Sequence, residues 1–367
     1  MKERNVKKAK YAVIGAGHGG MAVAGYLALN GFEVKIYNRS EERLWGIKSR
    51  KGISLEGEVV GFGKLALAST DIKEVIEDAD IIMVVIPATG HEFVAKQCAP
   101  YLKDGQIVLL NPGRTFGALE FKQIIDKEGC TADVIIAEAQ TFVFASRVMN
   151  PGQVHIFRIK NSIPVASIRA FMIPEVLERI SPAFPQFVAG DNIFKTSFEN
   201  IGAVFHPAIC VLNAGWIEDD AEFQFYLEGV TDSVARVLEE VDFERVKVAE
   251  ALGIRAISAR EWLFLAYGAF GENLKEAMRS NPGYRGIMAP NRLTIRYLSE
   301  DIPCSLVPIA SVGKKFNVPT PAIDALIKMA SILNKTDYWA IGRTVEKLQI
   351  QDLNLRELRL IAIGEKL

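Results

Sequence analysis

The sequence predicts an α/β domain with a doubly wound parallel sheet, followed by a second domain that is mainly helical. Three observations indicate this architecture. Short apolar runs alternate with amphipathic helical segments through the first half of the chain. A glycine-rich turn joins the first apolar run to the first helical segment. After a Ser-Pro-Ala-Phe-Pro segment at residues 181–185, helical spacing replaces the strand-like runs. We therefore expect domains at residues 1–184 and 185–367.

The expected strands are apolar almost throughout, as is typical of parallel strands buried on both faces. They span residues 11–14, 33–37, 81–86, 107–110 and 134–138, with a shorter strand near 65–68. The helical segments between them span residues 21–30, 41–51, 93–101 and 116–128, and residues 71–79 lead from the short strand into the strand at 81–86. Two later strands, 153–160 and 163–168, are separated by two residues, which predicts a hairpin at an edge of the same sheet. In the second domain, residues 223–252, 321–334 and 337–349 have helical spacing.

Composition is that of an ordinary globular protein. The chain has 367 residues, 49% hydrophobic and 24% charged, which is enough for two cores. A formal net charge of −1 gives no electrostatic reason to expect nucleic acid or an anionic membrane as a partner. No apolar run is long enough to span a bilayer. The basic opening residues lead into a short strand instead of an apolar signal-peptide region, so we expect no signal peptide and a cytoplasmic location.

Cysteine and histidine usage argues against disulfides and metal. The four cysteines are scattered and form no C-x-x-C pair, so we interpret them as reduced, mostly buried thiols. Cys304 is the alternative, as a catalytic thiol, because it lies near the candidate site described below. The four histidines are not clustered, and we expect no metal site.

A Gly-x-Gly-x-x-Gly motif directly follows the first expected strand and opens the first helix. Gly15 permits the tight turn, Gly17 lets the backbone approach a pyrophosphate, and Gly20 allows close packing of helix on strand. The free N–H groups of the helix N-terminus, beside His18, would bind the phosphates. This context predicts a Rossmann-type dinucleotide site; the alternative is a glycine-rich turn without a ligand.

The residues after the second strand bear on the choice of nucleotide. An NAD enzyme usually has Asp or Glu there, to bind the ribose hydroxyls. This chain has Asn38, Arg39 and Ser40, so no carboxylate would repel a 2′-phosphate. Arg39 can stack on adenine or pair with that phosphate, and Ser40 can donate a hydrogen bond; the alternative for Arg39 is a solvated residue at the start of a helix. The sequence therefore favours NADPH, with NADH as the alternative.

Further candidate cofactor residues follow the later strands, because ligands of open α/β sheets bind beyond the carboxyl ends of the strands. Pro87 follows the strand at 81–86, Asn111 follows the strand at 107–110, and Glu138 ends the strand at 134–138. The first two loops should approach the nicotinamide half of the cofactor. We interpret His91 as a structural or cofactor-neighbouring residue, not as a catalytic one.

The second half contains two polar features. Asn200 and His206, which precedes Pro207, lie in an otherwise apolar stretch. Arg296 and Asp301 place a cation and a carboxylate five residues apart. From the residues alone, His206 could be a core histidine bonded to a backbone carbonyl, and the two charges could be solvated. The residues alone therefore do not distinguish a functional site from a structural histidine and two solvated charges.

The chain resembles the opine dehydrogenase family (NAD/NADP octopine/nopaline dehydrogenases) through nearly its whole length. The motifs that carry the resemblance, in order, are the glycine loop, Asn111-Pro-Gly-Arg-Thr-Phe-Gly-Ala-Leu-Glu-Phe, Ala137-Glu138-Ala-Gln-Thr141, His206-Pro207, Phe225-Tyr226-Leu-Glu228-Gly229-Val-Thr, Glu240-Val-Asp-Phe-Glu-Arg245 and Arg296-Tyr-Leu-Ser-Glu-Asp301-Ile-Pro. The resemblance implies a helical second domain. It also implies reductive condensation at the domain cleft: an amino acid's amine joins a 2-oxo acid such as pyruvate, and NAD(P)H reduces the imine.

The resemblance also implies roles for particular residues. His206 becomes the acid/base residue, Asp301 its carboxylate partner, and Arg296 the anchor for a substrate carboxylate, with Asn200 as a second substrate-binding residue. Chemistry supports these roles, because histidine exchanges a proton near neutral pH and a carboxylate on its other nitrogen fixes the tautomer. A guanidinium binds a planar carboxylate by two hydrogen bonds.

Two other functions remain as alternatives. One is a two-domain dehydrogenase of the 2-hydroxy-acid, ketopantoate or glycerol-3-phosphate type; such enzymes often use a lysine near the substrate, and residues 198–213 and 291–303 contain none. The other is a dinucleotide-sensing protein without catalysis, which would bind nucleotide but would not need His206. A homodimer through the helical domain is a hypothesis about assembly.

Overall fold

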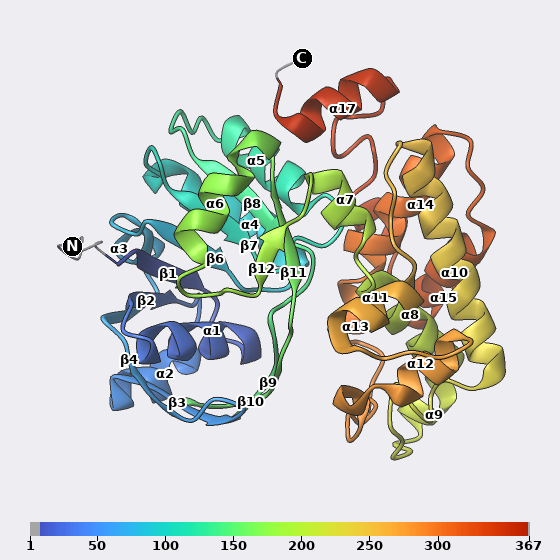
Figure 1. The fold of residues 1–367 in the computed structure, drawn as a ribbon, viewed down its shortest axis with the longest axis horizontal. Helices are drawn as coiled ribbons and strands as arrows, with labels where there is room; N and C mark the ends of the chain where they lie inside the picture. The colour runs from blue at the N-terminus through green and yellow to red at the C-terminus, as the bar shows by residue number, and fades with distance from the viewer. Residues whose placement is uncertain (1–7, 366–367) are drawn as a thin grey trace.

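The structure, a computed structural model, describes residues 8–365. The expectation of no signal peptide concerns residues 1–7 and lies outside this range. The described chain forms an α/β lobe and a helical lobe side by side (Figure 1). No helix of the described residues is long and apolar enough to cross a membrane.

An eight-stranded sheet forms the centre of the first lobe, with strand order β12-β11-β8-β7-β6-β1-β2-β5. Six neighbouring strands, from β8 to β5, are parallel; β11 is antiparallel to β8, and β12 is parallel to β11. The chain turns from one side of β1 to the other between β2 and β6, which creates the crevice where nucleotides bind in such sheets. The strands are β1 (Lys10–Ile14), β2 (Glu33–Tyr37), β5 (Leu67–Ser69), β6 (Ile81–Val84), β7 (Ile107–Leu110), β8 (Ile135–Ala139), β11 (Ile163–Ser167) and β12 (Phe187–Ala189).

Helices cover both faces of this sheet, as the apolar strands predicted. Alternate residues of β1 enter different cores: Ala12 and Ile14 join the core that contains α3, α4 and α5, whereas Tyr11 and Val13 join the core with α1, α2 and α6. These helices are α1 (His18–Leu29), α2 (Glu41–Arg50), α3 (Ile72–Ile76), α4 (His91–Cys98), α5 (Gly117–Lys127) and α6 (Ile173–Ile180). The doubly wound α/β fold is confirmed.

A second, four-stranded sheet was not predicted. Its order is β4-β3-β10-β9, and it packs against α1. Its strands are β3 (Gly52–Gly57), β4 (Gly61–Lys64), β9 (Phe144–Asn150) and β10 (Gln153–Ile159). The predicted hairpin of residues 153–160 and 163–168 is therefore wrong, because β10 belongs to this sheet and β11 to the main one. The two residues between them carry the chain from one sheet to the other, and a short spacing alone cannot distinguish that crossing from a hairpin.

The second lobe is helical, as expected. Its helices are α7 (Ile193–Phe198), α8 (Gly202–Leu212), α9 (Ala214–Glu218), α10 (Asp232–Ala251), α11 (Ala259–Tyr267), α12 (Leu274–Ser280), α13 (Arg296–Ser299), α14 (Val307–Lys315), α15 (Pro321–Leu333) and α16 (Tyr338–Ile341). The last helix, α17 (Leu355–Ile363), contacts residues 170–172 of the first lobe. A π-helical turn, η5 (Ile302–Leu306), precedes α14. The main sheet extends to Ala189, beyond residue 184.

Two helix predictions in this lobe were too long. Residues 223–231 are not helical, because the N–H of Phe225 donates to the carbonyl of Ile287 and Gln224 bridges to Met288. The predicted helix at 337–349 is only the short α16, which ends before Gly342. The next residue, Arg343, extends into the first lobe instead. In both cases a tertiary contact overrides the local helical spacing.

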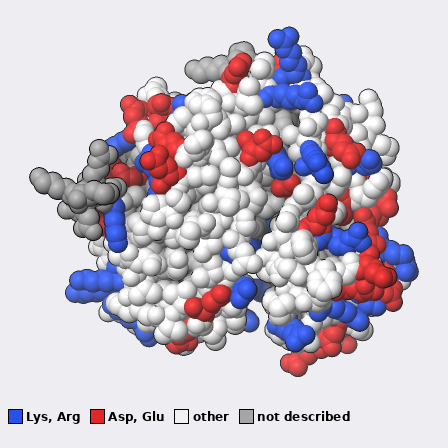
Figure 2. All heavy atoms as spheres, in the orientation of Figure 1, with Lys and Arg blue, Asp and Glu red and all other residues white. Residues whose placement is uncertain are grey.

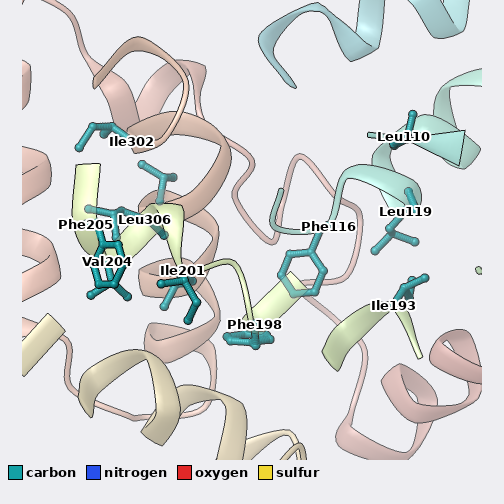
Figure 3. Close-up of a cluster of buried hydrophobic side chains, with 14 of the residues drawn as sticks. Leu110, Phe116, Leu119, Ile193, Phe198, Ile201, Val204, Phe205, Ile302 and Leu306 are labelled. Carbon is teal, nitrogen blue, oxygen red and sulfur yellow. The ribbon is translucent and has the colours of Figure 1, made fainter. Parts of the chain in front are cut away.

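The two lobes share one apolar core (Figure 3). Phe116, at the start of α5, packs edge-on against Phe194 and Phe198 of α7, with ring centroids 5.5 and 5.7 Å apart. The core continues through Ile201 to Val204 on α8. The segment before α5 is thus fixed to the helical lobe.

The end of the chain returns to the first lobe. Arg343 is 2% exposed and its guanidinium pairs with Glu120 of α5 at 2.6 Å. It also donates to the carbonyls of Gly113, Thr115 and Ala88 at 3.1–3.3 Å. A single cation therefore joins the loops after β6 and β7 to the helical lobe.

Candidate active site

The glycine loop has the geometry that a dinucleotide needs. Gly15 has a φ of +111°, which favours glycine, and a Cβ on Gly20 would lie 1.8 Å from the Gly15 carbonyl oxygen. No atom lies within 4 Å of the Cβ position of Gly17, so its backbone is open to a ligand. His18 begins α1, is exposed, and its Nδ1 accepts from the N–H of Val148 at 2.8 Å. These residues fit a pyrophosphate at the N-terminus of α1.

The end of β2 forms the adenosine side of this crevice. Asn38 accepts from the N–H of Ala16 at 3.1 Å and donates to the hydroxyl of Ser40 at 3.1 Å, so its side chain joins the glycine loop to the start of α2. Arg39 is exposed. Its guanidinium is thus available at the edge of the crevice.

On the nicotinamide side, the candidate residue after β6 is exposed, whereas the candidate residue after β7 is buried. Pro87 is exposed, as a cofactor contact would be in the free protein. Asn111 is 1% exposed, and neither its Nδ2 nor its Oδ1 has a hydrogen-bond partner. A buried amide without partners is costly, so these atoms fit a polar group supplied by a bound ligand.

The structure does not bring Glu138 to the glycine loop. Its carboxylate accepts from the N–H of Ala118 at 2.8 Å and from the hydroxyls of Thr196 and Ser197 at 2.6 and 3.1 Å. Burial raises the pKa of Glu138 to about 7, opposed by these donors. It therefore joins β8 to α5 and α7. His91 is fully buried, with its Nδ1 3.1 Å from Arg343 and no hydrogen-bond partner for its Nε2.

In the helical lobe, His206 and Asp301 come together although they are 95 residues apart. Nδ1 of His206, on α8, lies 2.8 Å from Oδ2 of Asp301, just before η5. Asp301 is fully buried, whereas the His206 side chain is 13% exposed. On the other side of the imidazole, Nε2 lies 3.0 Å from the hydroxyl of Tyr226. With Nδ1 donating to the carboxylate, Nε2 accepts from Tyr226 and is the basic atom of the pair.

The environment sets the charges of this pair. Burial lowers the pKa of His206 below its ordinary value, although the Asp301 carboxylate acts in the opposite direction. Burial alone would raise the pKa of Asp301, but Arg114 and His206 together hold it below its usual range. At neutral pH the pair is therefore a neutral imidazole beside a carboxylate.

Beneath the pair lies a buried ion network that crosses between the lobes. Arg114, from the loop after β7, pairs with Asp301 at 3.1 Å and with Glu300 at 3.0 Å. Glu300 also accepts from the N–H of Ala88, after β6, at 3.1 Å. Asn200 accepts from Arg114 at 3.4 Å and donates to Ser305 at 2.8 Å. Asn200 thus supports Arg114 and is itself only 2% exposed.

Aromatic rings enclose the imidazole. Tyr297 stacks on His206 with centroids 4.3 Å apart and planes at 20°. Tyr226 stacks on Tyr284 at 4.2 Å. Arg296, beside Tyr297, is exposed, and its guanidinium lies 5.8 Å from the centre of that ring. Its positive charge lowers the pKa values of both His206 and His18, after the larger effect of burial in each case. The charge of Arg296 thus acts on both histidines, and its neighbour Tyr297 stacks on the imidazole.

The structure thus brings together most of the residues singled out in the sequence. His206, Asp301 and Arg296 converge at one place, facing the loops that carry Asn111 and Pro87. Sequence reasoning gave no role to Arg114, Tyr226, Tyr297 or Arg343. Three of these lay within quoted motifs, but nothing in the local pattern showed that Arg114, Tyr226 and Tyr297 would meet around His206 and Asp301. No cluster of metal-ligating side chains occurs among residues 8–365.

Fold and site together define a two-domain pyridine-nucleotide dehydrogenase. A family model described as "NAD/NADP octopine/nopaline dehydrogenase, alpha-helical domain" matches residues 189–334, and one described as "NAD-dependent glycerol-3-phosphate dehydrogenase N-terminus" matches residues 10–119. An opine dehydrogenase of Arthrobacter sp. (strain 1C) is 40% identical over 96% of this chain and 99% of its own length. The chain belongs to the opine dehydrogenase family.

Solved structures show the same fold. An octopine dehydrogenase described with NADH and L-arginine has a TM-score of 0.78 at 21% identity, covering 98% of this chain and 99% of that one. A yersinopine dehydrogenase described with NADP⁺ has a TM-score of 0.77 at 13% identity, covering 95% and 99%. The α/β lobe with a helical second lobe is therefore the fold of these enzymes.

Proposed function

We propose that this enzyme joins the amine of an amino acid to the carbonyl of a 2-oxo acid and reduces the resulting imine, with His206 as the acid/base residue. The convergence of His206, Asp301 and Arg296 between the two lobes carries the proposal. Membership of the opine dehydrogenase family supports it.

Substrate binding would begin with Arg296. Its exposed guanidinium can hold the carboxylate of the oxo acid by two hydrogen bonds, which fixes the direction of the neighbouring carbonyl. Since Arg296 directly precedes Tyr297, which stacks on His206, that carbonyl carbon would lie close to the imidazole.

Proton transfer would then fall to His206. Condensation forms a C–N bond and releases the carbonyl oxygen as water, so a proton must reach the leaving hydroxyl. Protonated Nε2 of His206 can deliver it, and Asp301 stabilises the imidazolium through Nδ1. Because His206 is neutral in the free enzyme, it would take this proton from the ammonium of the amino acid, which makes the amine nucleophilic. Loss of water then leaves a protonated imine that needs only a hydride to become the secondary amine. In the reverse direction, neutral Nε2 accepts the proton of the water that adds to the imine carbon.

The reductant fits the crevice beyond β1 and β6. Gly15, Gly17 and Gly20 would hold the pyrophosphate, and Asn111 offers its partnerless amide near the nicotinamide. When bound, NAD(P)H supplies the hydride that converts the imine to the secondary amine.

We also propose that NADPH is preferred to NADH. Asn38 uses its side chain within the protein, and the exposed Arg39 beside it can pair with a 2′-phosphate. The measurement is kcat/KM for the two nucleotides under the same conditions. Equal values, or a higher value for NADH, would remove the preference. A homodimer and a cytoplasmic location stay predictions from the sequence.

The central experiment follows the NADPH absorbance of purified enzyme with pyruvate and each proteinogenic amino acid in turn. Omission of either substrate is the control. Oxidation of NADPH only when both are present, with a secondary amine as product, is the expected result. Oxidation with the oxo acid alone would assign the protein to the hydroxy-acid dehydrogenases. Nucleotide binding without turnover over a panel of oxo acids would instead favour a sensor.

A further inference from the structure

Lys160 is a cation in the cleft that has no role in the chemistry described so far. It lies between β10 and β11, where the chain passes from the second sheet to the main one. It is half-buried, and its Nζ donates to the hydroxyl of Thr141 at 2.8 Å and to the carbonyl of Phe142 at 2.7 Å. An ammonium has three N–H donors, so one of them remains for a ligand.

The position of Lys160 is on the substrate side of the crevice. Thr141 and Phe142 follow the carboxyl end of β8, which is separated from β1 by β7 and β6. The residue before Thr141, Gln140, donates to Glu199 at 3.2 Å, and Glu199 accepts from the N–H of Ile257 at 3.3 Å. The loop that holds Lys160 therefore abuts the helical lobe, and Figure 1 shows β9 and β10 on the side that faces this lobe.

The charges around Lys160 are unbalanced. The charged groups that act on it are Arg114 and Arg296, and both are cations. Arg114 is neutralised by Glu300 and Asp301. Among residues 8–365, neither Lys160 nor Arg296 forms an ion pair with a carboxylate. The half-buried ammonium of Lys160 thus has no anionic partner in the described chain, and the carboxylate of a ligand would supply one.

The product of an opine-type condensation carries two carboxylates, one on each carbon beside the secondary amine. This inference rests on the proposed function. If Arg296 binds the carboxylate of the oxo acid, the carboxylate of the amino acid still needs a partner on the other side of the nitrogen. We propose that Lys160 binds the α-carboxylate of the amino acid substrate and so directs its amine at the carbonyl held by Arg296.

This role has a pH signature. Burial lowers the pKa of Lys160 to about 7, and the charges of Arg114 and Arg296 act in the same direction. In the free enzyme the ammonium loses its proton as the pH rises through that value, whereas a bound carboxylate favours the protonated form. The contribution of Lys160 to amino-acid binding is therefore largest below pH 7 and declines above it.

The test compares the wild type with Lys160→Met, Lys160→Arg and the control Lys328→Met, which removes an exposed lysine on α15. The substrates are pyruvate and the amino acid that gives the wild type its highest rate. We expect Lys160→Met to raise KM for the amino acid about tenfold or more at pH 6.5. KM for pyruvate and the Kd for NADPH should stay within about twofold. Lys160→Arg should retain most of the affinity, and its benefit should persist above pH 8, because arginine keeps its charge.

Each other outcome overturns the inference in a recognisable way. A weaker Kd for NADPH in Lys160→Met would make the ligand the pyrophosphate. A fall in kcat alone would make Lys160 a proton donor, as in lysine-dependent dehydrogenases. A loss of thermal stability with equal effects on both KM values would make it a support for the loop at Thr141. An unchanged KM for the amino acid would leave it without a substrate role. If the wild type forms no secondary amine from any pair, the proposed function fails first and this inference with it.

Discussion

The two halves of the cofactor crevice are built differently. The adenosine half is local: the glycine loop, Asn38 and Arg39 lie within one strand–helix–strand unit, and Arg39 is exposed. The catalytic half is assembled from distant segments, with Arg114, Glu300 and Asp301 buried beneath His206. Changes in the first half should therefore alter nucleotide choice alone, whereas changes in the second should alter chemistry or the stability of the whole molecule.

The largest effect should follow replacement of the acid/base residue. His206→Gln should lower kcat by about 10²–10⁴-fold, because the imidazole no longer transfers the proton. The Kd for NADPH should be unchanged, since His206 lies outside the nucleotide loop. His155→Gln, on β10, is the matched control. A variant that retains more than a tenth of wild-type kcat would show that another group handles the proton.

The buried cation that joins the lobes should matter most for stability. Arg343→Met leaves Glu120 and three backbone carbonyls without their partner, so we expect a loss of about 3–5 kcal/mol in the free energy of unfolding. Denaturant unfolding measures it. The double variant with Glu120→Gln should regain part of the loss, because the unpaired charge is gone. A loss below about 1 kcal/mol would mean that the lobes do not depend on this residue.

On the adenosine side the effect should be confined to nucleotide choice. Arg39→Gln should raise KM for NADPH about tenfold, because a charge-assisted hydrogen bond to the 2′-phosphate is lost. KM for NADH and the unfolding free energy should not change. Arg50→Gln, at the exposed end of α2, is the control. If Arg39→Gln weakens both nucleotides equally, Arg39 binds adenine or the ribose and carries no preference.

The smallest effect should come from Tyr226. Its hydroxyl donates to Nε2 and so favours neutral His206, in addition to the larger effect of burial. Tyr226→Phe should therefore raise the pKa of His206. Since oxidation of the secondary amine needs neutral His206, the acid limb of its pH–rate profile should move to higher pH, with kcat on the plateau changing only a few-fold. An unmoved limb combined with a large fall in kcat would instead make Tyr226 a proton relay.

Regions built from one stretch of the chain could be predicted from the sequence, whereas regions assembled from distant segments could not. The parallel strands and the glycine loop were predicted because each needs only its own apolar run or spacing. The second sheet was missed because its central pair, β3 and β10, joins segments that are far apart in the sequence, and residues 52–57, 61–64 and 144–150 were not predicted as strands. Glu138 was predicted as a cofactor residue, but its carboxylate is taken up by Ala118, Thr196 and Ser197 from two other segments.

The amino-acid sequence alone predicted the doubly wound α/β lobe, the helical second lobe and the nucleotide loop, and it named His206, Arg296 and Asp301 as candidates. These follow from periodicity, from glycines that a local turn requires, and from the order of motifs. Folding brings Nδ1 of His206 to Asp301, Arg114 to the acids beneath them, and Lys160 to Thr141 and Phe142 after β8. The reason is physical: the charge state of a buried group depends on the neighbours that packing brings to it, and these neighbours are far away in the sequence. His206 and Asp301 are 95 residues apart, and Arg114 and Glu300 are 186 residues apart.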